Sequence, residues 1–527
     1  MGGKKRYCVK NANSLTDAAH LGCTFMRETT NESKANIIFH ALATSNGFEA
    51  SLDQLKAFQK VSKIPGVYES NKKTSLAKML ARFAELDTQH ANLVGEFWPK
   101  TFLLPSELSK IESILKKNEG KRQSRRKTLI AKPSSGSQGE GISLLQTVSD
   151  LRSMMQVSFQ NNRTAIVQEY LPKPFLLRET KRKFDLRCYV LVQSVDPLII
   201  HLHKEGLARF CTEDYEQPNQ SNLHDSFKHL TNYSLNKRSE NYIHRCDNSE
   251  DEGGSLGDGS KRTLTSVLAQ MFADTKEDDD TFNLPVFYSK LASMSSICLK
   301  AMQPCLINAI RKVRTSGCDL GGGGSFHILG LDVLIDEDFN PWLLEMNANP
   351  SMRMDFEEFD NFTGRSVSIV SRVDEYVKGT IMTDFMNVIC ADSSSLISKN
   401  VINVDCSGLP EVFVSIEKIY SSLTKRETRV TLSKNRFLAT KILGVKASMA
   451  DIDLVHQRWS MRVSEENSRN DDVSNNSLAV VELIAFSDLV INLANLDQKD
   501  GKGDSKTVME SLQDVLERAS NFMKERA

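Results

Sequence analysis

Three polar side chains within two apolar runs have the types needed for a hard-metal site. Asp332 lies in FHILGLDVLI, and Glu345 and Asn347 lie in PWLLEMN, with the polar segment 336–340 between the runs. Two apolar runs joined by a short polar turn predict a β-hairpin. Because side chains alternate along a strand, Glu345 and Asn347 would share a face that Asp332 can also reach. Carboxylate and amide oxygens suit Mg²⁺ in company with phosphate oxygens, although acids on a solvated sheet face also fit.

A loop of small residues, KPSSGSQGEGI at 132–142, joins two apolar runs. Glycine and serine allow backbone N–H groups to approach phosphate oxygens, and Lys132 would add a positive charge. The segment is not a Walker A loop, because no Gly-Lys-Ser/Thr closes it. A Gly-rich hairpin turn remains the alternative.

The segment KFDLR places Lys183, Asp185 and Arg187 at alternating positions. If the segment is a strand, these three charges share one face, which suits a phosphate or acyl-phosphate site. An exposed amphipathic strand fits the same pattern. The segment QEYL at 168–171 ends another apolar run, and its backbone and apolar side chains suit an adenine ring.

The elements that must position these residues alternate in type along the chain. Runs rich in Val, Ile and Leu predict strands at 128–132, 141–145, 165–170, 184–192 and 198–203. Apolar spacing predicts helices within 70–115, near 150–155 and at 284–314. The basic segment 116–127 is expected to be an exposed loop, and the acidic, Gly/Ser-rich segment 247–260 a flexible insertion. This mixture predicts an α+β or α/β fold.

Composition sets few limits on function. The 527 residues contain 67 basic and 67 acidic side chains, and a net charge of zero excludes neither nucleic acid nor an acidic partner. None of the ten cysteines lies in a CxxC pair, which indicates reduced thiols and no structural zinc. No apolar run reaches the roughly 18–20 residues of a membrane span, and the basic N-terminus lacks the apolar segment of a signal peptide.

The order of these motifs resembles the tubulin tyrosine ligase-like family from about Lys73 to Arg353. The segments that carry the resemblance are NKKTSLAKML, FWPKTFLLPSE, KPSSGSQGEGI, VQEYLPKPFLL, KFDLRCYVLV, HLHKEGLARFCTEDY, HLTNYSLNK, GSKRTL and ILGLDVLIDEDFNPWLLEMNANPS. The resemblance implies an α+β ATP-grasp fold, in which two lobes hold ATP, followed by a C-terminal helical domain. The expected domains are a variable segment 1–60, a catalytic domain 61–390, a helical and partly basic domain 400–500, and a terminal helix 501–527.

The resemblance also implies roles for individual residues. The expected catalytic residues are Lys183, Asp185 and Arg187. The expected ATP contacts are Lys73, Lys132, Gln138, Gly139, Glu140, Gly141, Ile142, Gln168, Glu169, Tyr170, Leu171, Lys183, Asp185, Thr231 and Asn232. The expected Mg²⁺ ligands, for two ions, are Asp332, Glu345 and Asn347. The expected contacts of the incoming amino acid are Arg209, Tyr233, Ser234 and Lys261.

The implied reaction joins a carboxylate to an amine through an acyl-phosphate. Several motifs, among them LARFCTEDY and NANPS, resemble the elongating polyglutamylase branch, which implies L-glutamate as donor and the acidic tails of tubulin as acceptor. We therefore expect a monomeric enzyme that binds neither nucleic acid nor membrane. Its expected location is the cytoplasm and its microtubules, and more narrowly a cilium, flagellum or basal body. A glycylase, a ligase for another acidic protein, and a non-catalytic microtubule-binding scaffold are the alternatives.

The C-terminal region has a basic stretch. Residues 415–446 contain eight basic and two acidic side chains, a net charge of +6. Such a stretch suits an acidic microtubule surface, and a solvated helix face is the alternative. The succession of helices expected over 411–496 also resembles a degenerate EF-hand-like module, but no intact calcium loop is present, so no Ca²⁺ binding is expected.

Overall fold

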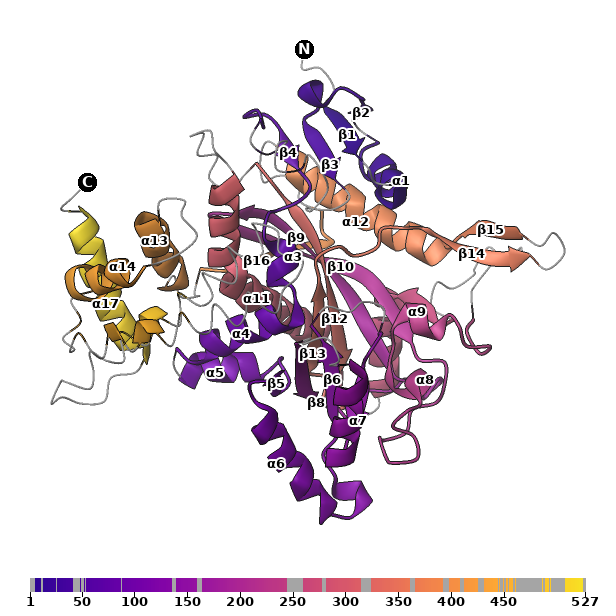
Figure 1. The fold of residues 1–527 in the computed structure, drawn as a ribbon. Helices are drawn as coiled ribbons and strands as arrows, with labels where there is room; N and C mark the ends of the chain where they lie inside the picture. Colours follow the sequence, from indigo (N-terminus) through magenta and orange to yellow (C-terminus); the bar gives the residue numbers. More distant parts are fainter. Residues whose placement is uncertain are drawn as a thin grey trace.

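Figure 1 shows the computed structural model. It describes residues 5–10, 13–24, 26–40, 54–86, 88–134, 139–158, 164–243, 259–276, 281–313, 324–360, 365–391, 398–407, 412–424, 431–443 and 508–524, with isolated residues at 48 and 52 and between 445 and 493. Most of the insertion expected at 247–260 lies outside these residues.

A six-stranded antiparallel sheet forms the centre of the molecule (Figure 1). Its strands are β9 (Phe184–Val195), β10 (Leu198–Phe210), β11 (Lys261–Thr263), β12 (His327–Ile335), β13 (Pro341–Asn347) and β16 (Val401–Val404). The order is β11-β10-β9-β12-β13, and β16 also pairs with β10. The sheet therefore continues past residue 400, where the sequence placed the start of a separate domain.

Two long helices cover opposite faces of this sheet. Leu186 and Cys188 of β9 belong to the same apolar core as α11 (Leu284–Val313), whereas Tyr189 belongs to the core formed with α12 (Arg372–Cys390). Successive side chains of a strand point to opposite faces. Asp185 and Arg187 therefore lie on the face of the sheet that α12 covers.

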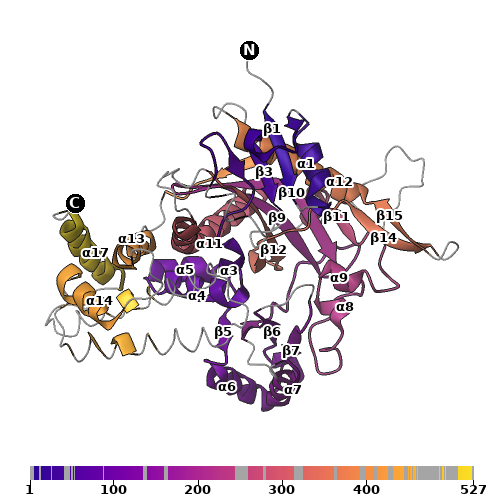
Figure 2. The same cartoon turned by 45° about the horizontal axis from the view of Figure 1, so that its top comes forward.

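A smaller four-stranded sheet forms a second lobe, below the central sheet in Figure 2. Its strands are β5 (Thr101–Leu104), β6 (Leu129–Pro133), β7 (Ser143–Leu145) and β8 (Ala165–Glu169), in the order β5-β8-β6-β7. Helices α6 (Leu108–Glu119) and α7 (Val148–Ser158) contribute to its core. The sequence predicted helix at β5, but pairing with β8 and burial of Phe102 and Leu104 favour a strand there.

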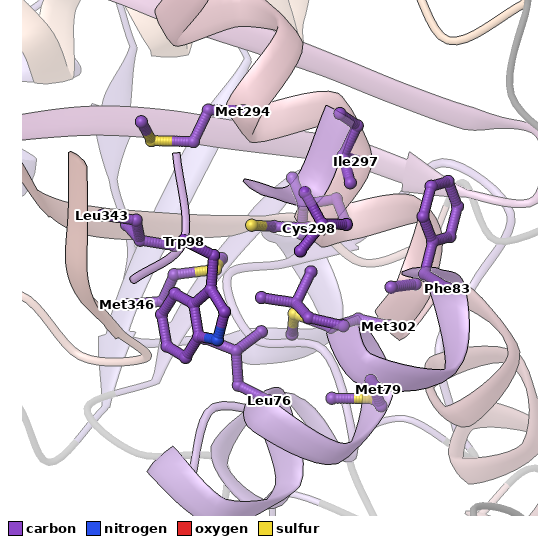
Figure 3. Close-up of a cluster of buried hydrophobic side chains, with 14 of the residues drawn as sticks. Leu76, Met79, Phe83, Trp98, Met294, Ile297, Cys298, Met302, Leu343 and Met346 are labelled. Atoms are coloured by element: carbon purple, nitrogen blue, oxygen red, sulfur yellow. The ribbon is translucent and has the colours of Figure 1, made fainter. Parts of the chain in front are cut away.

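An apolar cluster connects two elements that carry site residues with the long helix α11 (Figure 3). Leu76 of α4 (Lys73–Ala84) lies in it together with Met302 of α11 and Met346 of β13. Because Met346 points into this core, Glu345 and Asn347 on either side of it point the other way, toward Asp332. Burial of this cluster therefore fixes which face of the hairpin carries the acids.

Smaller elements complete the catalytic region. The N-terminal part is a parallel sheet of β1 (Arg6–Lys10), β2 (Arg27–Glu28), β3 (Ile37–His40) and β4 (Lys60–Val61), with α1 (Asn13–Gly22) against α12. The short helices are α3 (Val67–Ser70), α5 (Thr88–Gly95), α8 (Ser226–His229), α9 (Tyr233–Asn236), α10 (Leu264–Thr275), and the 3-10 turns Glu32–Lys34 and Gln123–Arg125. An exposed hairpin of β14 (Asp355–Asp360) and β15 (Arg365–Val370) projects from the body in Figure 1.

The C-terminal helices pack beside α11 and α5 in Figures 1 and 2. They are α13 (Val412–Thr424), α14 (Leu432–Phe437), the π-helical turn Leu438–Ile442 and α17 (Val508–Lys524). Glu417 of α13 is 0% exposed and lies 2.5 Å from Arg311 of α11. A buried carboxylate thus anchors α13 on the catalytic region.

The mixture of antiparallel sheets and helices confirms the predicted α+β class. The helix predicted at 284–314 and the five strands predicted between 128 and 203 are all present. Within the described part of the chain, no helix is both long and apolar enough to cross a membrane.

Candidate active site

A cleft lies between the two sheets. Predicted site residues that line it are Lys132, Ile142, Gln168, Glu169, Tyr170, Leu171, Lys183, Asp185, Thr231, Asn232, Asp332 and Glu345. A smaller adjoining pocket is lined by Lys73, Gly139, Glu140, Ile142, Asn232 and Glu345 among others. The fold therefore gathers residues from positions 73 to 345 around one space.

The hairpin predicted for the acids is present, with Asp332 directly opposite Glu345. The Asn347 amide nitrogen donates to Asp332 Oδ2 at 3.3 Å and to Glu345 Oε1 at 3.2 Å. Two carboxylates and an amide thus converge on one point at the edge of the cleft. This donor set fits Mg²⁺, which takes one or two carboxylates and completes its coordination with phosphates and water. Among the described residues, no group of three or more His, Cys, Asp or Glu side chains could hold a metal ion by itself.

Two arginines surround Asp332. Arg187 Nε donates to Asp332 Oδ1 at 2.5 Å, and Arg209 Nη2 lies 2.8 Å from Asp332 Oδ2. Burial by itself would raise the pKa of Asp332, but these two guanidinium groups outweigh it and hold that pKa well below its usual range. Asp332 is therefore ionised at neutral pH, as a metal ligand must be.

Gly330 makes room for Arg187. A Cβ atom at Gly330 would lie 2.9 Å from Arg187 Cδ and 3.1 Å from its Nε. The guanidinium therefore passes directly over the glycine on its way to Asp332. The glycine of the ILGLD segment is required by this close approach rather than by a turn.

Arg209 bridges a predicted catalytic acid, Asp185, and a predicted metal ligand, Asp332. Its Nε donates to Asp185 Oδ1 at 2.7 Å, and its Nη2 contacts both Asp185 and Asp332. The register explains the contact, because Arg209 lies directly opposite Asp185 on the neighbouring strand. Arg209 therefore connects the expected metal ligand to the rest of the α12 face.

Three lysines bring positive charge to the cleft. Lys132 donates to Gln168 Oε1 at 2.8 Å and to the Leu344 carbonyl at 3.1 Å, and Lys73 lies 3.2 Å from Glu345 Oε2. Lys183 donates to the Tyr170 hydroxyl at 2.9 Å. Burial lowers the pKa of Lys132 to about 8, and burial likewise lowers the pKa of Lys183 to about 8. An anion in the cleft would offset this cost of burying the charged forms.

Residues of the glycine loop and of the adenine segment both line the cleft. Gly139 and Gly141 have positive φ angles of 85° and 72°, a backbone region that favours glycine. Ser135 to Gln138 lie outside the described residues, so the predicted role of Gln138 stays a prediction. Leu171 and Ile142 supply apolar surface on the cleft lining.

The side chain of Gln168 is hydrogen-bonded at both ends within the protein. Its amide nitrogen donates to Thr101 Oγ1 at 2.9 Å, and its carbonyl oxygen accepts from Lys132. With a buried side chain bonded at both ends, Gln168 orients Lys132 in addition to lining the cleft. The alternation of β8 explains this, because Gln168 points inward between Val167 and Glu169.

A comparison with known protein families identifies the family of this chain. The model of the Tubulin-tyrosine ligase family matches residues 50–279 and 280–374, more than half of the chain. This chain belongs to the tubulin-tyrosine ligase family. The ATP-grasp-like, α+β fold expected from the resemblance is thereby shown.

Several curated members of the family are similar to this chain. Tubulin polyglutamylase TTLL11 of Mus musculus is 36% identical over 330 residues, which is 62% of this chain and 42% of that protein. Tubulin polyglutamylase TTLL7 of Xenopus tropicalis is 32% identical over 331 residues, 63% of this chain and 33% of that protein. Tubulin polyglutamylase ttll6 of Danio rerio is 34% identical over 345 residues, 64% of this chain and 37% of that protein. The chain thus spans well under half the length of the relatives it matches.

Within this family member, the residues predicted for the amino acid lie beside Arg209. Lys261 of β11 is directly opposite Arg209, and its ammonium group lies 4.1 Å from the centre of the Tyr233 ring. Ser234 follows on α9 and is half-buried. The fold therefore brings together Arg209, Lys261 and Tyr233, and Ser234 follows Tyr233 in the chain.

Sequence reasoning missed several residues of the site. Asp374 of α12 contacts Lys261, and Lys378 of the same helix contacts Asp374. His229 accepts from Lys183 through its backbone carbonyl, and its ring contacts the Tyr170 hydroxyl at 3.2 Å. The motif HLTNY could have suggested His229, whereas nothing in the sequence of α12 distinguishes Asp374 from an exposed helix acid.

The basic C-terminal stretch is described only in part. Of its eight basic side chains, the structure describes those of Lys418, Lys434 and Arg436, and it does not describe the other five side chains. Arg436 is paired with Asp453 at 2.5 Å, and the buried Glu417 is paired with Arg311. The predicted microtubule contact of this stretch stays a prediction.

Proposed function

We propose that this chain is an ATP- and Mg²⁺-dependent ligase that joins L-glutamate to glutamate side chains in the acidic tails of tubulin. The observation that carries the proposal is the convergence of Asp332, Glu345 and Asn347 with three lysines on one cleft. Relatives named tubulin polyglutamylase support the choice of amino acid and of acceptor.

The nucleotide would lie between the two lobes. Its adenine would contact the apolar wall near Leu171 and Ile142, and its phosphates would lie near Lys132, Lys183 and Lys73. Charged donors that point into a cleft hold phosphate oxygens and fix the geometry of the γ-phosphate. Asp332, Glu345 and Asn347 would hold Mg²⁺, two ions in our proposal, which neutralise charge on the phosphates when bound.

The chemistry would run in two steps. A carboxylate of the acceptor attacks the γ-phosphorus of ATP, ADP leaves, and an acyl-phosphate forms. The amino group of the incoming glutamate then attacks the acyl carbon, and inorganic phosphate leaves. Lys183 and Arg187 offset the negative charge that develops on the transferred group. Arg209 and Lys261 bind the carboxylates of the incoming amino acid.

The wider setting is part of the same proposal. The acidic tubulin tail would enter as an extended chain, and the basic residues of 415–446 would steer the encounter with the microtubule. We propose a monomer that acts on microtubules in the cytoplasm or cilium, lengthens existing glutamate chains, and binds neither nucleic acid nor membrane.

The choice of amino acid can be tested directly. Purified protein would be incubated with microtubules, ATP and Mg²⁺, and with either labelled glutamate or labelled glycine. The proposal expects label from glutamate on tubulin and none when ATP is omitted. Label from glycine alone would replace the polyglutamylase with a glycylase, and label on no substrate at all would favour a non-catalytic scaffold.

A further inference from the structure

A second cluster of buried charge lies beside Arg209 on the α12 face of the sheet. Lys261 is paired directly with Arg209 across β10 and β11, so the two side chains share that face. Lys261 Nζ lies 2.6 Å from Asp374 Oδ2, and Lys378 Nζ lies 2.8 Å from Asp374 Oδ1. We refer to Lys261, Asp374 and Lys378 as the α12 trio.

The α12 trio is held firmly in place. Asp374 is in the first turn of α12, is 3% exposed, and accepts a hydrogen bond of 2.7 Å from the hydroxyl of Ser371, the N-cap residue. Lys378, one turn further on, also donates to the backbone carbonyl of Arg353. The three donors around the carboxylate of Asp374 restrict it to one orientation. The ammonium group of Lys261 is thereby fixed between Asp374 and the ring of Tyr233.

The charges of the trio do not cancel. Burial would raise the pKa of Asp374, but the charges of Lys261 and Lys378 outweigh it and hold that pKa well below its usual range. One carboxylate between two ammonium groups leaves a net charge of +1. Without Lys378, Asp374 would neutralise Lys261 completely. The second lysine therefore lets Asp374 orient Lys261 without removing its attraction for an anion.

We propose that Asp374 and Lys378 are positioning residues that hold Lys261 at a fixed place beside Arg209, so that the subsite selects an amino acid with two carboxylates. The inference rests on the proposed glutamate ligase function. Arg209 already uses Nε and Nη2 on Asp185 and Asp332, so it would bind one carboxylate through its remaining Nη1 group, and the oriented ammonium would bind the other. Glycine has one carboxylate and gains nothing from the second cation.

The test compares two buried aspartates of the same helix. Asp374→Asn removes the charge that orients Lys261, whereas Asp384→Asn changes an acid that contacts His203 and Asn400 away from the cleft. We expect Asp374→Asn to raise KM for glutamate about tenfold, the size of one lost charge-assisted hydrogen bond, with KM for ATP unchanged. Asp384→Asn should leave both KM values unchanged.

A second substitution covers the case in which Asp374→Asn fails to fold. Lys378→Met removes the net charge of the trio but keeps Asp374 against Lys261, and it should also raise KM for glutamate while Lys378→Arg restores it. For Asp374→Asn and Lys378→Met, the ratio of kcat/KM for glutamate to that for glycine should fall.

The outcomes separate the two levels of the argument. A wild-type protein that incorporates no glutamate would overturn the proposed function and this inference with it. A wild-type protein that does incorporate glutamate, alongside an Asp374→Asn or Lys378→Met protein with unchanged KM for glutamate, would overturn this inference alone. Equal rises in KM for ATP and glutamate would also overturn it, because they would indicate a structural role.

Discussion

If the cleft binds ATP as proposed, we expect its two buried lysines to make that binding depend on pH. In the free protein the pKa of Lys132 and that of Lys183 are about 8, because both ammonium groups are buried. Phosphate oxygens close to a lysine favour its charged form, so we expect both pKa values to return toward the usual value of about 10.4 when ATP binds. Binding above pH 8 must therefore take up protons.

The magnitude follows from the fraction of each lysine that is charged. Between pH 7 and pH 9 the charged fraction of a group with a pKa of 8 falls from about 90% to about 10%, so each lysine lowers ATP affinity roughly tenfold, or about 1.4 kcal/mol. The two lysines together should lower it by up to about a hundredfold. The sign is fixed, because a lowered lysine pKa in the free protein weakens anion binding as pH rises.

Calorimetric titration with ATP in two buffers of different ionisation enthalpy would measure affinity and proton uptake together. Lys132→Met should bind ATP more weakly at pH 7 and lose about half of the pH dependence. Lys63→Met is the matched control, because burial also lowers the pKa of Lys63 to about 8 but its partner is Asn349 outside the cleft lining. An ATP affinity that is flat from pH 7 to 9, with no proton uptake, would refute the reasoning.

Three further predictions follow from single contacts. Gly330→Ala should displace Arg187 from Asp332 and lower kcat by about an order of magnitude or more, with little change in Tm. Activity assays and thermal melts would measure both quantities. An unchanged kcat would contradict the role given to this glycine. The pKa of Asp332 is lower in the folded protein than in the unfolded chain, where it is about 4, so the ionised carboxylate stabilises the fold above about pH 4. That stability is lost as the pH falls further. Urea titrations should therefore show the difference in free energy of unfolding between wild type and Asp332→Asn narrowing below about pH 4. Arg311→Met removes a partner of the buried Glu417 and should lower the free energy of unfolding by about 1–3 kcal/mol. The double variant with Glu417→Met should recover part of that loss. An unchanged Tm in the single variant would show that the pair does not anchor α13.

The sequence was most informative where chemistry depends on alternation within one strand. Asp185 and Arg187 share a face because they are two residues apart, and Glu345 and Asn347 do so for the same reason. The turn between β12 and β13 then sets Asp332 opposite Glu345, so the metal-type donor set could be predicted from 16 residues of local sequence.

Contacts between distant elements could not be predicted in this way. Asp374 reaches Lys261 across 113 positions of the chain, and Arg311 reaches Glu417 across 106, so both depend on how helices pack on the sheet. The strand β5 was missed for a related reason: its short apolar segment continues a helical pattern, and only pairing with β8 makes it a strand. Tertiary packing decided these features, not local propensity.

The most direct test of the central claim is mass spectrometry of tubulin tails after reaction with ATP, Mg²⁺ and glutamate. Wild-type protein should add glutamate residues, and Glu345→Gln should add none, because one of the two carboxylates of the proposed Mg²⁺ site is lost. Glu337→Gln is the matched control, since Glu337 belongs to the turn of the same hairpin and pairs with the exposed Lys173. Full activity of Glu337→Gln with none in Glu345→Gln is the predicted result. Normal glutamate addition by Glu345→Gln would contradict the assignment of this cleft as the active site.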